Sequence, residues 1–220
     1  MTVRVEVTAD RRFGTNSYLV VDDYTHDAVV IDSNLEPALV VDAARERGAN
    51  VKAVLLTHTD LDHIAGLHEL REAFGPIPIA VHDAERDVLD QGRPLRREFG
   101  PIATRVDNLA SLADGEPYRA GSLQFEVLHT PGHSPGGVTF KIDGFLFTGD
   151  ALFAGSVGRS DFTNSNSTAL LDGIRSKLLI QPDEMIVYSG HGPATTIGRE
   201  RTMNPFLGAG GSGSPRGTPL

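Results

Sequence analysis

Four side chains that can bind a metal ion lie within six residues of one another, in the segment Thr57-His58-Thr59-Asp60-Leu61-Asp62-His63. The segment follows an apolar stretch typical of a buried strand and precedes a helical pattern. Imidazole and carboxylate groups hold zinc, iron or manganese without sulfur. An extended loop can direct His58 and Asp60 to one side and Asp62 to the other, while His63 opens the helix, which would serve two neighbouring metal positions. The alternative is a polar helix start in which Asp60 or Asp62 is the N-cap and both histidines are solvated.

Three further segments place a histidine or an aspartate directly after a predicted strand. They are His129-Thr130-Pro131-Gly132-His133-Ser134-Pro135-Gly136-Gly137, Thr148-Gly149-Asp150 and Ser189-Gly190-His191-Gly192-Pro193. Each segment alone would most often be a turn, although a turn does not explain why His133 lies at its centre. A carboxylate at a strand end, as at Asp150, is well placed to bridge two cations. Strand ends can open at one edge of a fold, so we predict a single metal site formed by all four loops.

The remaining histidines have simpler explanations. His129 ends a predicted strand, where a hydrogen-bonded structural histidine is at least as common as a ligand. His26 lies in a charged turn and His68 in the middle of a predicted helix, and both are expected at the surface. His82 ends a strand and is a candidate partner of a metal ligand.

Composition excludes several other classes of protein. The chain has 220 residues, which suits one large domain, and its formal net charge of −9 disfavours nucleic-acid and anionic-membrane binding. It has no cysteine, so disulfides, cysteine zinc sites and cysteine nucleophiles are excluded. No apolar run approaches the ~18–20 residues of a membrane span, and the N-terminus carries no apolar signal core. We therefore expect a cytoplasmic protein whose partner is a small-molecule substrate, without nucleic acid or membrane.

Periodicity predicts strands and helices in two similar halves. Strands are predicted over residues 3–8, 18–21, 28–31, 51–56, 77–81, 123–128, 138–142, 145–147 and 185–188. Helices are predicted over residues 35–47, 64–74, 83–89, 169–179 and 198–204, the third capped by Asp83. The segment 91–114 is expected to be irregular, and residues 208–220, rich in Gly, Ser and Pro, to be a disordered tail after a domain of residues 1–207. The order suggests an α/β (α+β) fold with two packed sheets and outer helices, an αββα sandwich.

Taken together, the four loops resemble those of the metallo-β-lactamase-fold hydrolases, and within them the glyoxalase II-like group. Further marks of that resemblance are Gly158-Arg159-Ser160-Asp161-Phe162, Gly192-Pro193-Ala194-Thr195-Thr196, Glu200 and Asn204-Pro205-Phe206-Leu207. The resemblance covers roughly residues 1–207 and implies a four-layer αββα fold with a dinuclear metal centre that hydrolyses esters, thioesters or lactones. Glyoxalase II enzymes add a C-terminal helical domain that helps to hold glutathione, and this chain ends soon after Leu207, so glutathione specificity is not implied.

The resemblance also implies a role for each site residue. His58 and His133 match ligands of the first metal, and Asp62, His63 and His191 match ligands of the second. Asp150 matches the bridging carboxylate, and Asp62 would also orient the attacking hydroxide. Two divalent ions are expected, zinc foremost, with iron or manganese as alternatives that an oxygen-rich ligand set favours.

Position 60 departs from the family, because most members carry a second histidine of the first metal there and this chain carries Asp60. We expect Asp60 to reach the first metal directly or through one water, and the remaining alternative is a three-coordinate first site. The length of the loop from His58 to His63 matches that of the family, so its backbone should present position 60 to the metal.

Two other functions stay open. The persulfide dioxygenases of the superfamily use one iron held by two histidines and one aspartate, which match His58, His133 and Asp150. The other alternative is a noncatalytic member of the superfamily that binds metal. The substrate itself is not predicted; its pocket is expected from residues 10–16, 91–101 and 153–162.

Charged residues near this predicted pocket are expected either to bind the substrate or to stabilise the local structure. Arg93, Arg96 and Arg97 would either meet an anionic substrate or lie on a charged surface helix, the commoner meaning of such a run. Arg159 and Asp161 are expected to pair and brace the loop after Asp150.

Overall fold

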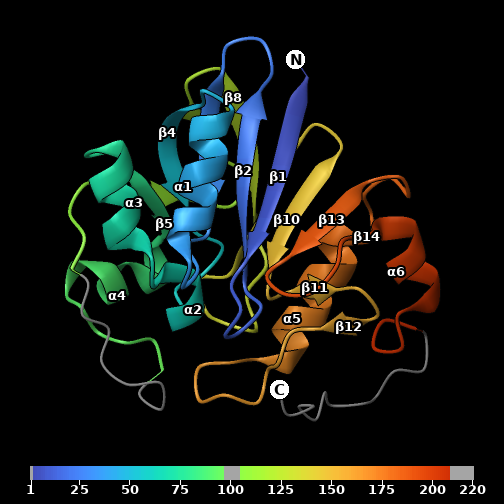
Figure 1. Cartoon of the computed structure of the whole chain (residues 1–220). Helices are drawn as coiled ribbons and strands as arrows, with labels where there is room; N and C mark the ends of the chain where they lie inside the picture. Colours follow the sequence, from blue (N-terminus) through green and yellow to red (C-terminus); the bar gives the residue numbers. More distant parts are fainter. Residues whose placement is uncertain (1, 97–104, 209–220) are drawn as a thin grey trace.

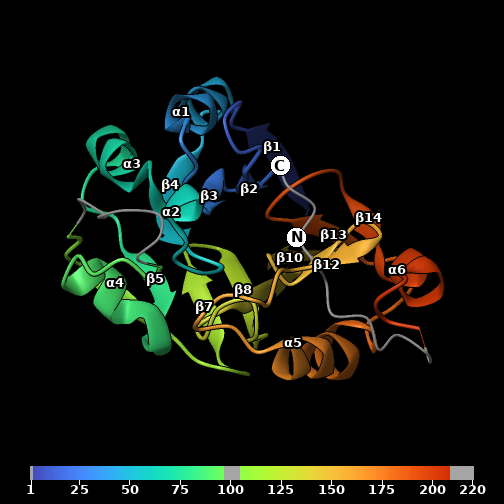
Figure 2. The ribbon, with the colours of Figure 1, turned by 90° about the horizontal axis from the view of Figure 1, so that it is seen from below.

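Two six-stranded sheets face each other in the computed structural model, which describes residues 2–96 and 105–208, and helices cover both outer faces (Figures 1 and 2). The first sheet runs in chain order: β1 (Val3–Ala9), β2 (Asn16–Asp22), β3 (Asp27–Ile31), β4 (Asn50–Leu55), β5 (Ile79–His82) and β6 (Leu109–Leu112). The second has the order β14 (Thr195–Thr196), β13 (Ile186–Ser189), β10 (Phe145–Gly149), β9 (Val138–Ile142), β8 (Leu123–His129) and β7 (Pro117–Ala120). A small hairpin joins β11 (Leu152–Phe153) to β12 (Ser156–Val157). The αββα prediction is confirmed.

The outer layers are formed by helices that pack on one sheet each. The first sheet carries α1 (Pro37–Glu46), α2 (Leu61–Ile64), α3 (Leu67–Phe74), η1 (Asp83–Glu85) and α4 (Arg86–Asp90). The second carries α5 (Ser167–Gly173), its continuation as a π-helical turn, η3 (Ile174–Leu178), and α6 (Ile197–Met203). Figure 2 shows the two helical layers on opposite sides of the sheets.

The buried apolar side chains form three layers, one between the two sheets and one between each sheet and its helices. On β2, Leu19 and Val21 belong to the cluster under α1 and α3, whereas Tyr18 and Val20 belong to the cluster between the sheets. Side chains alternate between the two faces of a strand, so a strand covered on both faces is apolar throughout. The third cluster lies between the second sheet and α5, η3 and α6. The sheets are thus rigid supports for the loops that follow their strands.

The helix predicted over residues 64–74 is wrong as a single element, because it is divided into α2 and α3. The division falls at Gly66, where a Cβ would lie 2.6 Å from the Asn34 carbonyl oxygen and 2.7 Å from the Pro37 Cβ. The chain must therefore pass closely under the first turn of α1, and only glycine leaves room for it. Pro37 occupies the first turn of α1, as predicted.

Other element boundaries differ for local reasons. The segment 91–114, predicted to be irregular, contains β6, which pairs in parallel with β5. The short strands β7, β11, β12 and β14 are too short or too polar to show an alternating pattern. The helix at residues 83–89 is capped by His82, whose Nδ1 accepts from the Ala84 amide, and not by Asp83. The helix at 169–179 begins earlier, because the Asn166 side chain caps α5.

Arg97 and the tail from residue 209 onward lie outside the described residues, and so do their predictions. Within residues 2–96 and 105–208, every helix is too short or too polar to span a membrane.

Candidate metal centre

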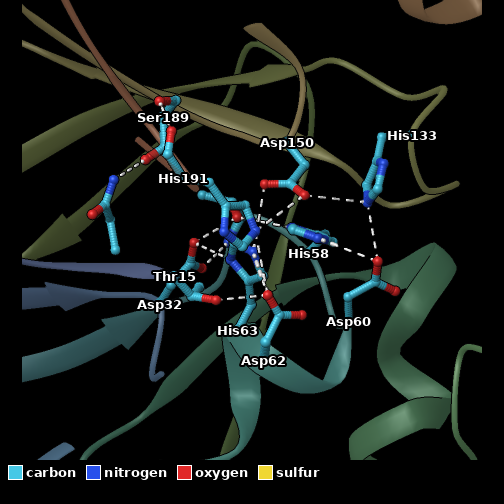
Figure 3. A network of polar contacts seen from close by, with 12 residues as sticks. Thr15, Asp32, His58, Asp60, Asp62, His63, His133, Asp150, Ser189 and His191 are labelled. Carbon is cyan, nitrogen blue, oxygen red and sulfur yellow. Dashed lines mark hydrogen bonds and ion pairs between the residues drawn. The ribbon is translucent and has the colours of Figure 1, made fainter. Parts of the chain in front are cut away.

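The four loops meet at one edge of the sandwich and bring all seven predicted ligand residues together (Figure 3). They contribute three overlapping groups whose ligand atoms lie within 4.8 Å of one another: His58, Asp60 and His133; His58, His63 and Asp150; and Asp62, His63 and His191. Below, the first half-site means His58, Asp60 and His133, and the second half-site means Asp62, His63 and His191. The interpretation of the loop 57–63 as a solvated helix start is wrong, since His58 and His63 are buried and Asp60, the N-cap of α2, makes no side-chain capping hydrogen bond.

Each histidine of the cluster is fixed through its Nδ1 atom. The Nδ1 of His63 donates to the Asp32 carboxylate at 2.8 Å. The Nδ1 of His133 donates to the Arg159 carbonyl at 2.7 Å, and the Nδ1 of His191 donates to the Phe13 carbonyl at 3.2 Å. The Nδ1 of His58 lies 3.1 Å from the Thr57 hydroxyl, which already donates its own proton to Asp32. These partners select the tautomer whose Nε2 lone pair faces the centre, as in known metal sites.

Asp150 lies between the two half-sites. Its Oδ1 is 3.5 Å from the Nε2 of His63, and its Oδ2 is 3.6 Å from the Nε2 atoms of both His133 and His191. One carboxylate therefore faces ligands of both half-sites, which is the position that a bridging carboxylate needs. Asp62 closes the second half-site, with its Oδ2 3.3 Å from the Nε2 of His191.

Two observations show that a cation fits here. The Nε2 atoms of His58 and His63 and the Oδ1 of Asp150 are buried without a hydrogen-bond partner among the described residues. Buried polar atoms are normally paired, so three orphans facing one another point to a missing positive partner. The space is also kept open, because a Cβ at Gly190 would lie 2.1 Å from Asp150 Oδ1 and 2.7 Å from the Cε1 of His63.

The charges of the cluster favour a cation as well. Burial alone would raise the pKa of Asp150, but His191 and His63 hold it well below its usual value. Burial would lower the pKa of His63, but the carboxylates of Asp62, Asp32 and Asp150 raise it well above the usual value. A site that attracts protons to imidazole nitrogens attracts metal ions to the same atoms.

Two residues that support the second half-site were not singled out from the sequence, although Thr15 lies in the segment 10–16 that was expected to line the pocket. Asp32 follows β3 and accepts three hydrogen bonds, from the amide and hydroxyl of Thr57 and from His63. The Thr15 hydroxyl donates to Asp62 at 2.7 Å. A carboxylate directly after a strand was the pattern used for Asp150, and the same pattern marks Asp32.

A third missed residue, Glu85, joins two ligand loops. It is 1% exposed, and its Oε2 accepts from the Thr59 amide and hydroxyl, each at 2.7 Å. Its Oε1 accepts from the Gly136 amide at 2.7 Å. Thr59 lies between His58 and Asp60, and Gly136 lies three residues after His133, so one carboxylate holds the two loops of the first half-site together.

Asp60 faces the two histidines of the first half-site, with its Oδ2 3.0 Å from the Nε2 of His133 and 3.7 Å from that of His58. It also forms an ion pair with Arg96, whose Nε lies 2.7 Å from Asp60 Oδ1. Arg96 is buried in a nonhelical segment, so its place on a charged surface helix is wrong. Arg93 is exposed.

The other charged and histidine side chains lie apart from the ligand cluster. Arg159 and Asp161 pair at 3.1 Å, as predicted. The contacts of His129 lie outside the cluster. Its Nε2 donates to the Pro135 carbonyl at 3.0 Å, and its ring stacks on the ring of His82. His82 is therefore not a partner of a metal ligand. His26 and His68 are exposed.

Sequence comparisons agree with this site. A family model described as the metallo-beta-lactamase superfamily matches residues 10–191. A probable metallo-hydrolase of Streptococcus pyogenes, M6_Spy0554, is 36% identical over 214 residues, covering 93% of this chain and 90% of the relative. Hydroxyacylglutathione hydrolase GloC of Haemophilus influenzae is 33% identical over 212 residues, covering 93% of this chain and 98% of the relative.

Solved structures show the same fold. BLEG-1 B3 metallo-beta-lactamase matches with a TM-score of 0.83 and 34% identity, over 94% of this chain and 99% of that one. TTHA1623 in a di-iron-bound form matches with a TM-score of 0.80 and 34% identity, over 92% of this chain and 100% of that one. ETHE1 from Myxococcus xanthus matches with a TM-score of 0.76 and 29% identity, over 93% of this chain and 84% of that one. The chain therefore belongs to the metallo-β-lactamase superfamily, and with its His/Asp cluster it is a metallo-hydrolase of that superfamily.

Proposed function

We propose that this protein hydrolyses a thioester or a related ester of a small molecule, in the manner of the glyoxalase II-like group, with two divalent metal ions. The observation that carries the proposal is the place of Asp150 between two sets of imidazole nitrogens. Support also comes from the similarity to a hydroxyacylglutathione hydrolase over nearly the whole length of both chains. Zinc, iron and manganese all suit the ligands, and a di-iron form of a structural neighbour keeps iron among them.

Bound ions in such a site lower the pKa of water towards neutrality and stabilise the oxyanion that develops from a carbonyl group. The protein's own residues hold and orient these groups. His58 and His63 are fully enclosed, whereas the side chains of Asp62 and His191 are 22% and 26% exposed. Substrate therefore approaches past Asp62 and His191, and Asp62, fixed by Thr15, is placed to orient the attacking water.

The proposal is tested with the full chain, stripped of metal and reloaded separately with zinc, iron(II) or manganese(II). Each form is assayed against a panel of thioesters, including a hydroxyacylglutathione, and against esters, lactones and a β-lactam. We expect thioester or ester hydrolysis without oxygen uptake, in a form that holds two ions per chain. Absence of hydrolysis from all loaded forms would refute the proposal.

A second candidate is a mononuclear iron dioxygenase that acts on a persulfide. It is favoured by one observation: Asp150 lies within reach of His133 and in one group with His58, which gives a two-histidine, one-carboxylate set. The iron(II) form is incubated with glutathione persulfide in an oxygen electrode. Oxygen consumption with one iron per chain would favour this candidate over the hydrolase.

A further inference from the structure

Arg96 is the most firmly held cation beside the cluster. Its side chain is 3% exposed, and its Nε lies 2.7 Å and 2.9 Å from the two carboxylate oxygens of Asp60. Nη2 donates to the His133 carbonyl at 2.9 Å, and Nη1 is 3.5 Å from the Ser165 hydroxyl. The guanidinium also lies over the ring of Phe162, with 3.9 Å from Cζ to the centroid. These contacts fix the guanidinium, because it is buried and bonded on several sides.

The guanidinium reaches a ligand atom of the first half-site. Nη2 of Arg96 is 3.3 Å from the Nε2 of His133. The same Nε2 lies 3.0 Å from Asp60 Oδ2, so Arg96 contacts both this ligand atom and the carboxylate beside it. A metal ion in the first half-site would need the same Nε2 atom and the same carboxylate. A guanidinium does not lose its proton in proteins, so this competition is permanent.

The two half-sites consequently differ in charge. In the first, the positive Arg96 offsets the negative Asp60. In the second, Asp62 is bonded to a threonine hydroxyl and faces imidazoles. Within residues 2–96 and 105–208, no lysine or arginine forms an ion pair with Asp62 or Asp150. A divalent cation therefore meets less competition and more negative charge in the second half-site.

We infer that Arg96 competes with a metal ion for Asp60 and His133 in the first half-site. The chain then binds two metal ions with unequal affinities and fills the second half-site first. This inference rests on the proposed dinuclear centre and adds an order to its filling. A metal ion enters the first half-site only by sharing or displacing the Arg96 contacts. Asp60 and Arg96 thus act as a pair.

The test is a zinc titration of the metal-free full chain by calorimetry and by competition with a chromogenic chelator, with metal content as a second readout. For the wild-type chain we expect one tight step and a second step at least tenfold weaker. Arg96→Met keeps an unbranched apolar side chain beside Phe162 but removes the charge, and it should strengthen the weak step at least tenfold. Arg201→Met is the control. Arg201 donates to the carbonyls of Leu179 and Gln181 and pairs with Asp183, none of which lies in a ligand loop, so the metal affinities should not change.

The position of the tight ion is tested without any change at Arg96. His191→Ala should abolish the tight step, and His133→Ala should abolish the weak one. Two equal steps in the wild-type chain, a tight step that disappears in His133→Ala, or a folded Arg96→Met with an unchanged weak step would each overturn the inference. Hydrolysis by a chain with equal steps would leave the proposed function standing. Unequal steps in a chain that hydrolyses nothing would instead refute the proposed function alone.

Discussion

Replacing Glu85 by glutamine tests whether the loops of the first half-site depend on one buried carboxylate. The substitution keeps the shape of the side chain but replaces one acceptor oxygen with an NH₂ group. Three N–H or O–H donors, two from Thr59 and one from Gly136, then meet a single acceptor. In either orientation the NH₂ group faces a donor, so at least one buried donor loses its partner.

The magnitude follows from those contacts. A hydrogen bond to a charged group contributes roughly 1.5–3 kcal/mol, and an unsatisfied buried donor costs about 1–3 kcal/mol. Glu85→Gln removes at least one bond of this kind and sets two donors against each other, so the free energy of unfolding of the metal-free protein should fall by about 2–4 kcal/mol. Because the loops that carry His58 and His133 lose their common support, zinc affinity should fall roughly 10–100-fold, the usual effect of removing a residue that orients metal ligands.

Glu200→Gln is the matched control. Glu200 is also 1% exposed, and it accepts from the Gly155 amide at 2.8 Å, the Thr195 hydroxyl at 2.6 Å and the Asn204 amide group at 2.8 Å. None of these partners lies in a ligand loop of the first half-site. Glu200→Gln should therefore lose a similar amount of stability and keep its zinc affinity.

Stability is measured by urea unfolding of the metal-free proteins, followed by circular dichroism. Zinc affinity is measured by chelator competition at a temperature where all three proteins are folded. If both variants lose the same zinc affinity, the effect is one of general stability and the positioning role of Glu85 is refuted. A folded Glu85→Gln protein with unchanged zinc affinity would refute it as well.

Four further predictions concern the cluster and its surroundings. His133→Ala should abolish hydrolysis and remove one ion from metal analysis, and retained metal and rate would contradict its role as a ligand. His129→Gln should lower the melting temperature but keep metal content, because His129 contacts the Pro135 carbonyl outside the cluster. Gly190→Ala should fold but lose metal, since its Cβ would enter the space beside Asp150; bound zinc in this variant, measured by metal analysis, would argue against that geometry. Zinc affinity of the wild type should fall as pH falls, and the fall should begin above the usual histidine pKa of ~6.5, because carboxylates raise the pKa of His63, His133 and His191 and protons then compete with zinc. Chelator competition between pH 5.5 and 8.5, flanking that value by roughly 1–2 units, measures this dependence.

The sequence predicted that these seven side chains lie together, because the loops that carry them follow strands and strand ends are set by short-range apolar patterns. His58, Asp150 and His191 each lie just beyond a stretch that its pattern marks as buried. The four-layer fold was predictable for the same reason, since the alternation of two half-buried sheets with helices leaves few arrangements. The break between α2 and α3 was not, because it depends on the close approach of Gly66 to Asn34 and Pro37, which are about thirty residues away in the chain.

The supporting residues were harder to predict because their partners are distant in sequence and carry no local pattern. Glu85 lies in a short helical segment where a charged residue is expected at the surface, and only the tertiary structure buries it between two loops. Arg96 stood among other arginines, with nothing in its neighbours to separate it from Arg93. Arg96 differs from Arg93 because it binds Asp60, which lies 36 residues away in the chain. Without Arg96, Asp60 would be a buried carboxylate balanced by imidazoles alone.

The pairing of Asp60 with Arg96 also gives a physical reason for an aspartate at position 60. A histidine at position 60 would be neutral and could not balance a buried guanidinium, and an uncompensated buried charge is strongly unfavourable. Conversely, Asp60 without Arg96 would add a third carboxylate, after Asp62 and Asp150, to one small cluster. Each residue therefore makes the other tolerable, and a change at either one alone should perturb the site more than a change at both. Arg96→Met combined with Asp60→His should bind its second zinc ion more tightly than either single variant. If the change in zinc affinity of the double variant equals the product of the two single fold-changes, the two positions act independently and the pairing is refuted.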